Sequence, residues 1–88
     1  MKAIITVVGK DRTGIVAGVS TKIAELGLNI DDITQTVLDE YFMMMAVVSS
    51  QGSQDFAQLR KEFEAFGETL NVKINIQSSA IFDAMHNL

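Results

Sequence analysis

The sequence predicts an α+β fold of the ferredoxin-like kind, with the element order β-α-β-β-α-β. Two stripes of apolar residues at helical spacing each end near a glycine, and short runs rich in β-branched residues flank them. The two halves also echo each other, since Leu28-Asn29 follows the first stripe and Leu70-Asn71 follows the second, 42 residues later. Because crossovers of this kind are right-handed, we expect both helices on one face of a four-stranded antiparallel sheet with strand order 4-1-3-2.

The first half of the chain predicts a strand, a helix and a second strand. Residues 3–8 form an apolar, β-branched run that is typical of a strand buried on both faces. The helical stripe that follows consists of Ile15, Val19, Ile23 and Leu26. Asp11 or Thr13 can cap the start of this helix, and Gly27 suits the left-handed residue that ends it. Residues 29–38 then predict a half-exposed strand.

The second half predicts a strand, a helix and a last strand in the same order. A tight polar break at residues 39–40 joins the preceding strand to the apolar run 41–48, which predicts a hairpin. The second helical stripe consists of Phe56, Leu59, Phe63 and Phe66. We expect Gly67 to close this helix. Residues 70–77 alternate between apolar and polar, as a strand with one wet face does, and residues 79–88 predict a short terminal helix.

Length and composition exclude several classes of protein. A chain of 88 residues holds one domain. It has no cysteine, which excludes disulfides, thiolate metal sites and a cysteine nucleophile. No apolar run is long enough to span a membrane, and the N-terminus lacks the pattern of a signal peptide. We therefore expect a cytoplasmic protein without a membrane partner.

The charge of the chain is unevenly distributed. The net charge is −4, from 11 acidic and 7 basic residues, which disfavours nucleic acid as the main partner. Residues 1–30 carry four basic and two acidic residues, whereas residues 31–88 carry three basic and nine acidic ones. The positive N-terminal third indicates where an anionic group would bind, although ordinary scatter of surface charge gives the same count.

The predicted topology leaves one face of the sheet without a helix. Hydrophobic residues make up 48% of the chain, and the central strands are apolar on both faces. Either the terminal helix or another subunit must cover the outer face. We favour self-association, because open sheet faces and edges invite pairing.

The loop between the first strand and the first helix is the main candidate site. Gly9 and Gly14 have the spacing of a nucleotide P-loop, but Ile15 and Val16 stand where that motif needs lysine and serine or threonine. Free N–H groups at the helix start, together with Lys10 and Arg12, suit a carboxylate instead. Asp11 could receive an ammonium group. Alternatively, the loop is a capped turn whose charged side chains are solvated and bind no ligand.

Other polar residues give weaker signals. The side chain of Asn29 offers a hydrogen-bond donor and an acceptor together, which suits an amino-acid ligand. Asn71 occupies the matching place in the second half, so the alternative is a turn asparagine that the fold itself requires. Asp83 and His86 provide too few ligands for a metal site. The methionines at 43–45 alternate along a strand and are core or interface residues. We predict no metal and no cofactor.

Residues 7–17 and 26–30 carry a family resemblance. The run Asp11-Arg12-Thr13-Gly14-Ile15-Val16-Ala17 is similar to the ACT domains of the glycine cleavage system repressor and of formyltetrahydrofolate deformylase. The resemblance covers residues 2–78 and leaves residues 79–88 as a C-terminal helical extension. It implies amino-acid sensing at the interface between paired ACT domains. The ligand-binding residues that it implies are Asp11, Arg12, Thr13, Gly14, Ile15, Asn29 and Ile30.

These observations predict a regulatory module without enzymatic activity. We expect a homo-oligomer, a dimer first of all, that binds a small amino acid and acts in trans on a protein partner. One alternative is a ligand-free adaptor that uses the apolar sheet face. Another is an acylphosphatase-type hydrolase, which shares the topology and uses a loop arginine such as Arg12, although the phosphate cradle of that enzyme is not recognisable here.

Overall fold

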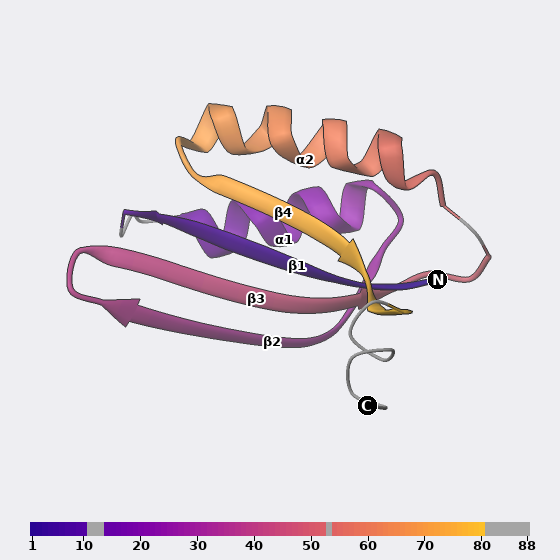
Figure 1. Cartoon of the computed structure of the whole chain (residues 1–88), viewed down its shortest axis with the longest axis horizontal. Coiled ribbons are helices and arrows are strands. Elements are labelled where there is room, and N and C mark those ends of the chain that lie inside the picture. The colour runs from indigo at the N-terminus through magenta and orange to yellow at the C-terminus, as the bar shows by residue number, and fades with distance from the viewer. Residues whose placement is uncertain (11–13, 53, 81–88) are drawn as a thin grey trace.

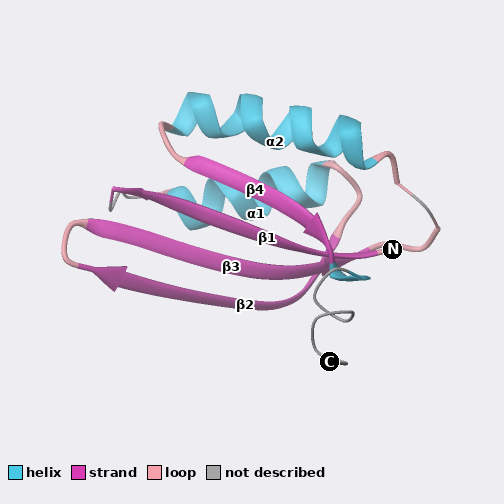
Figure 2. Cartoon of the chain, in the orientation of Figure 1, coloured by secondary structure: helices cyan, strands magenta, loops and turns pink. Residues whose placement is uncertain are grey.

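The computed structural model describes residues 1–10, 14–52 and 54–80 of the chain. Within these ranges the elements are β1 (Lys2–Lys10), α1 (Ile15–Glu25), β2 (Asn29–Leu38), β3 (Tyr41–Ser49), α2 (Phe56–Leu70) and β4 (Lys73–Ser78). The strands form one sheet in the order β2-β3-β1-β4, and all neighbours are antiparallel. The predicted ferredoxin-like topology is confirmed, and Figure 2 shows the sheet beside the helices. The predicted terminal helix at 79–88 falls mostly on residues 81–88, which lie outside the described part of the chain.

Both helices pack on the same face of the sheet (Figure 1). The helical stripes predicted from the sequence supply one side of the core, with Val19, Ile23 and Phe63 fully buried. The inward-facing residues of the strands supply the other side. They are Ala3, Ile5, Val7, Phe42, Met44, Ala46, Val48, Ile74 and Ile76. Since alternate strand residues point to opposite faces, this core leaves the other residue of each pair on the outer face.

The two helices end with the same pair of backbone hydrogen bonds. At the end of α1, Gly27 N–H donates to Ala24 and Leu28 N–H donates to Ile23, with Gly27 at φ 77° as predicted. At the end of α2, Asn71 N–H donates to Glu68, and Asn71 itself has φ 59°. Asparagine is one of the few residues with a side chain that adopts this left-handed conformation readily.

The prediction that Gly67 closes the second helix is wrong, because α2 continues through it to Leu70. Gly67 is buried where the helix lies close to the chain entering β4. A Cβ atom there would lie 2.7 Å from the carbonyl oxygen of Val72 and 3.3 Å from Ile74. Glycine is needed at this position for the close approach of helix and strand, and Asn71 makes the helix end.

The start of α1 also differs from the prediction that Asp11 or Thr13 caps it. The N-cap residue is Gly14, with φ 91°, and it has no side chain to accept a hydrogen bond. The first helical hydrogen bond runs from Gly18 N–H to Gly14 O, at 2.8 Å. The N–H groups of the first helical turn before Gly18 therefore have no partner within the helix.

The outer face and the β2 edge are more exposed than the sequence predicts. Outward-facing Ile4 and Thr6 of β1 are half-buried and Val8 is 40% exposed, so this strand is fully buried on its helix face only. In β2, Ile30 is half-buried and the other residues are exposed. The reason is the sheet order, which puts β2 at an edge with one strand neighbour. Neither helix of the described ranges has the length and apolar character needed to cross a membrane.

Candidate functional site

One half of the predicted site is the start of α1. The structure does not describe Asp11, Arg12 and Thr13, which lie in the gap between its first two ranges. Gly14 is exposed, and a Cβ atom on it would meet no atom of the described residues within 4 Å. Ile15 is 3% exposed and packs in the core, so only its backbone is available to a ligand. This half of the site offers N–H groups at the positive end of a helix, which bind anions.

The other half is the start of β2, at Asn29. The side chain of Asn29 is exposed, and its Nδ2 donates a hydrogen bond to Asp31 Oδ1 at 2.9 Å. Ser49 Oγ, at the end of β3, donates to the same oxygen at 3.0 Å. Ile30, which the sequence also predicts in the site, packs its side chain against the core. The polar group at this end therefore consists of Asn29, Asp31 and Ser49.

Asp31 and Ser49 are not among the site residues that the sequence predicts, and Asp31 is the charged member of the group. A β-bulge between Ile30 and Asp32 interrupts the pairing of β2 with β3 at this position. The hydrogen bonds from Ser49 and Asn29, together with the nearby charge of Lys2, lower the pKa of Asp31 below its usual value. A persistent carboxylate beside an amide and a hydroxyl suits an ammonium group. The sequence feature that could have indicated this site is the pair of adjacent aspartates, Asp31 and Asp32, in an otherwise strand-like run.

A shallow depression lies beside this group. It has a volume of about 600 Å³ and is lined by Gly27, Asn29, Ser49, Ser50, Gln51 and Gln54. The Oγ atom of Ser50 is buried and has no hydrogen-bond partner among the described residues. The Met1 ammonium group donates to the carbonyl oxygens of Ser50 and Gly52 and holds this loop against the start of β1. The depression is lined by uncharged polar groups, with the Asp31 carboxylate bonded to two of them.

The two halves of the predicted site do not meet within one chain. Gly14 precedes α1 and Asn29 follows it, and a helix of 11 residues is about 16 Å long. An amino acid is far too short to touch both ends of that helix. Gly14 and Asn29 can therefore contact one small ligand only if they come from different chains.

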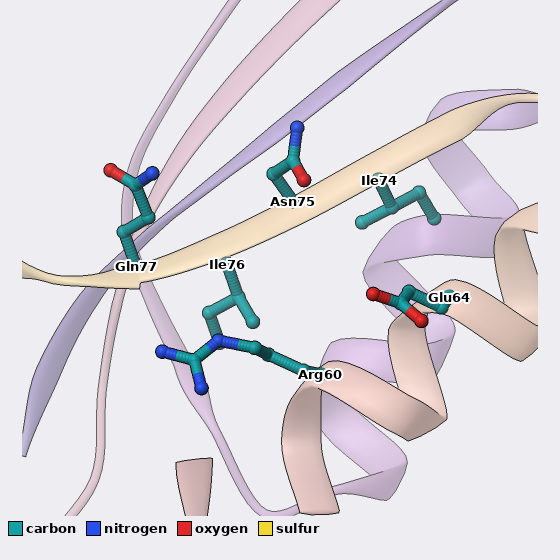
Figure 3. A pocket seen from close by; sticks show the side chains of 6 residues that line it. All are labelled: Arg60, Glu64, Ile74, Asn75, Ile76 and Gln77. Atoms are coloured by element: carbon teal, nitrogen blue, oxygen red, sulfur yellow. The ribbon is translucent and has the colours of Figure 1, made fainter. Parts of the chain in front are cut away.

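A second depression lies between α2 and the edge strand β4 (Figure 3). It has a volume of about 180 Å³, and Arg60 and Glu64 of the helix line one side of it. Figure 3 shows Asn75 and Gln77 on the opposite side of the strand ribbon from these two charges. Because the polar side chains do not converge, this depression is a weaker candidate than the Asn29 group.

Comparison with known proteins defines the class. The family model described as the ACT domain matches residues 2–77, nearly the whole sheet and both helices. The chain therefore belongs to the ACT domain family, as the resemblance of its first loop indicates. The part of the chain that carries the loop, both helices and all four strands is covered by this match.

Two relatives match this chain over nearly its whole length. A UPF0237 protein of Streptococcus mutans is 98% identical over 88 residues, and the match covers 100% of both chains. The solved structure of an ACT domain protein from Streptococcus pneumoniae is 84% identical, with a TM-score of 0.90 and 93% of each chain covered. The names of these relatives state a family and a domain but no ligand.

More distant structures share the fold alone. A formyltetrahydrofolate deformylase from Burkholderia mallei matches with a TM-score of 0.78 and 22% identity, over 90% of this chain and 28% of that one. A "putative glycine cleavage system transcriptional repressor" matches with a TM-score of 0.74 and 23% identity, over 86% of this chain and 44% of that one. Both proteins are those that the sequence motif indicates, and in both the matched fold is one part of a longer chain.

Proposed function

We propose that this chain is a regulatory module without enzymatic activity that binds an amino acid between two copies of itself and acts in trans on a partner in the cytoplasm. The observation that carries the proposal is the placement of the two half-sites at opposite ends of α1. Membership of the ACT domain family supports the regulatory class. A shared site makes ligand binding and assembly a single linked equilibrium, which is how a small domain can transmit a signal.

The exposed edge of β2 supports a particular pairing. Two copies related by a two-fold axis beside this edge would extend the sheet, with β2 antiparallel to β2 of the other copy. The start of α1 in one copy would then lie near the start of β2 in the other. Ile33 and Val37, on the helix side of β2, are 36% and 56% exposed and would be covered by this pairing. Unpaired edge strands with apolar side chains favour such contacts.

The ligand chemistry follows from the two half-sites. The N–H groups after Gly14 and the guanidinium of Arg12 would bind the carboxylate of an amino acid. Asn29 and Asp31 of the other copy would bind its ammonium group, with Asp11 as a second acceptor. Among the described residues, hydrogen bonds lower the pKa of the Asp31 and Glu62 carboxyl groups, which keeps both ionised rather than preparing a general acid.

A screen of amino acids by thermal unfolding tests the proposal. A ligand at about 100 times its dissociation constant adds about 2.7 kcal/mol to the free energy of unfolding. For a domain of this size, each kcal/mol raises the midpoint by about 4–8 °C. One amino acid or a small related set should give such a shift, whereas its carboxylate analogue without the amino group should not.

The ligand-free adaptor is the second candidate, because the exposed apolar side chains of the sheet support it independently of any ligand. Val8, Leu38, Tyr41, Met43 and Met45 are between 40% and 67% exposed. Flat melting curves for every amino acid would favour the adaptor over the sensor. Hydrolysis of an acyl phosphate by the wild type that is lost in Arg12→Ala would instead support the hydrolase.

A further inference from the structure

The outer face of the sheet has an apolar centre that no described helix covers. Along the two central strands the outward-facing residues include Val8, Met43 and Met45, which are 40%, 46% and 48% exposed. Their neighbours Ile4 and Val47 are half-buried. The solvent-exposed face of an antiparallel sheet normally carries polar residues. The edge strand β4 does so with Lys73, Asn75 and Gln77, so the apolar centre is specific to β1 and β3.

The charges around this centre separate into two halves. The basic residues of the face lie on β1 and β4, and they are Lys2, Lys10 and Lys73. The acidic residues lie on β2 and the turn that follows it, and they are Asp31, Asp32, Asp39 and Glu40. The boundary between the two halves runs between β1 and β3, which are neighbours in the sheet. A surface divided in this way is complementary to itself after a half-turn about that boundary.

We propose that a second copy of this chain covers the outer face, related by a two-fold axis that runs between β1 and β3 and roughly parallel to the strands. This axis puts β1 of one copy over β3 of the other and β4 over β2. Since Val8 pairs with Met43 and Thr6 with Met45 in the sheet register, the same pairs face each other across the interface. Each basic half lies over an acidic half.

The alternative axis, across the strands, is disfavoured by the same charges. It would put β1 over β1 and β2 over β2, so that basic residues face basic residues and acidic residues face acidic ones. Like charges opposed across an interface suppress association. Both axes keep the strands of the two sheets aligned, as packed sheets do at a separation of about 10 Å, so the charges decide between them.

The face is large enough for a stable dimer. Four strands about 4.8 Å apart and nine residues long in the centre give a footprint of roughly 19 Å by 30 Å. This planar footprint is of the same order as the roughly 800 Å² per partner that is typical of specific interfaces. Methionine and valine at the centre can interdigitate without burying a charge.

This interface is independent of the β2 edge pairing under the proposed function. If both form, the assembly does not close at four chains, because the stack puts β4 of one copy over β2 of the other and leaves the two free β2 edges on opposite sides, so chains add on in an open row. If the edge pairing is absent, the stacked faces alone give a dimer. The mass of an edge variant such as Val37→Lys distinguishes the two interfaces, because a dimer held by the stacked faces persists in that variant and a dimer held by the β2 edge becomes a monomer.

A charge-swap experiment tests the stacked interface. The substitutions Val8→Lys and Met43→Glu are made in separate chains, at positions exposed enough to tolerate a charge in the folded monomer. Each chain alone buries an unpaired charge in the interface, so light scattering should show a monomer if the stack is the only contact, or an edge-paired dimer if the β2 edges also pair. In an equal mixture Lys at 8 of one chain faces Glu at 43 of the other, and the wild-type mass should return.

The same swap at a second pair guards against a local folding defect. Thr6→Lys and Met45→Glu should separate alone and reassemble together, because Thr6 lies over Met45 in the proposed stack. Ala65→Glu, on the exposed side of α2, adds the same charge away from the sheet and should leave the mass unchanged. Single variants that keep the wild-type mass, or mixtures that do not reassemble, would overturn the proposal and point to another protein or to residues 81–88 as the cover.

Discussion

Two asparagines that follow the two helices have different roles. Asn71 adopts φ 59° and ends α2, so its place is set by the backbone. Asn29 starts β2 and directs its amide to Asp31 instead. The left-handed counterpart of Asn71 in the first half is Gly27, which shifts the internal match of the two halves by two residues. Asn29 is therefore not a left-handed asparagine at a helix end, as Asn71 is.

This difference predicts opposite effects of the same substitution. Asn29→Ala should weaken amino-acid binding by about tenfold, the loss expected for one hydrogen bond to a charged group, while the melting temperature stays within a few degrees. Asn71→Ala should lower the free energy of unfolding by about 1–2 kcal/mol, because the left-handed conformation costs alanine more free energy than asparagine. The ligand affinity of this variant should be unchanged. Calorimetric titration and urea unfolding of both variants measure the two effects. Equal ligand affinity in wild type and Asn29→Ala would remove Asn29 from the site.

Asp31 predicts a pH dependence of stability. The hydrogen bonds from Ser49 and Asn29 depress the pKa of the folded carboxyl group below the value of about 3.9 in an unfolded chain. Its stabilising contribution is therefore fully present above that unfolded value and is lost as the pH falls through the folded pKa. Urea midpoints of wild type and Asp31→Asn should differ most near pH 7 and converge as the pH falls below the unfolded pKa and through the lower folded one. A difference that grows on acidification would contradict this assignment.

At the scale of the elements, two helical glycines make a matched pair. A Cβ atom on Gly67 would lie 2.7 Å from the backbone oxygen of Val72, whereas one on Gly18 would lie 3.5 Å from Leu70 and 3.6 Å from Phe66, at ordinary contact distance. Gly18→Ala should therefore raise the free energy of unfolding by about 0.5–1 kcal/mol, through the better helix propensity of alanine.

Gly67→Ala should have the opposite sign. The clash with backbone must be relieved by moving α2 away from β4, which costs about 1–3 kcal/mol. Urea unfolding of the two variants at equal protein concentration measures both values. Similar gains in stability from both substitutions would mean that the approach of α2 to β4 is looser than the structure has it.

The sequence predicted the elements well and their ends less well. Periodicity identified both helices and all four strands, because the buried stripe of each helix and the inward face of each strand are determined by local spacing. It misplaced the end of α2, since a glycine that ends a helix and one that packs closely against a strand have the same letter. The exposure of β2 depends on sheet order, and Asp31 depends on a bulge. Neither is visible in the local pattern.

At the scale of the whole molecule, the candidate site is incomplete in one chain. The sequence predicted residues at both ends of α1, and the resemblance to ACT domains implied that a ligand joins them. Because Gly14 and Asn29 are separated by the length of α1, a ligand that touches both, as we propose, requires two chains. That requirement arises from the three-dimensional path of the chain, which the motif itself does not contain.

A shared site predicts that ligand and assembly are coupled in both directions. If the ligand binds only between two chains, its apparent affinity must fall as the protein is diluted below the dissociation constant of the β2 edge pairing. Conversely, a saturating amino acid must shift the edge equilibrium toward the paired form by the same factor. Sedimentation at a series of protein concentrations, with and without the amino acid identified by thermal shift, measures both sides of this relation.

The variant Val37→Lys separates this coupling from direct contact with the ligand. Val37 lies near the far end of β2 from Asn29, is 56% exposed, and belongs to neither predicted half-site. A lysine on an edge strand opposes pairing with another edge. The variant should therefore bind the amino acid at least tenfold more weakly at low protein concentration and recover affinity as the concentration rises. The Ala65→Glu variant should behave as wild type. Binding to Val37→Lys that is as tight as in the wild type at every dilution would show that one chain holds the whole site, and the linkage between ligand and assembly would fail with it.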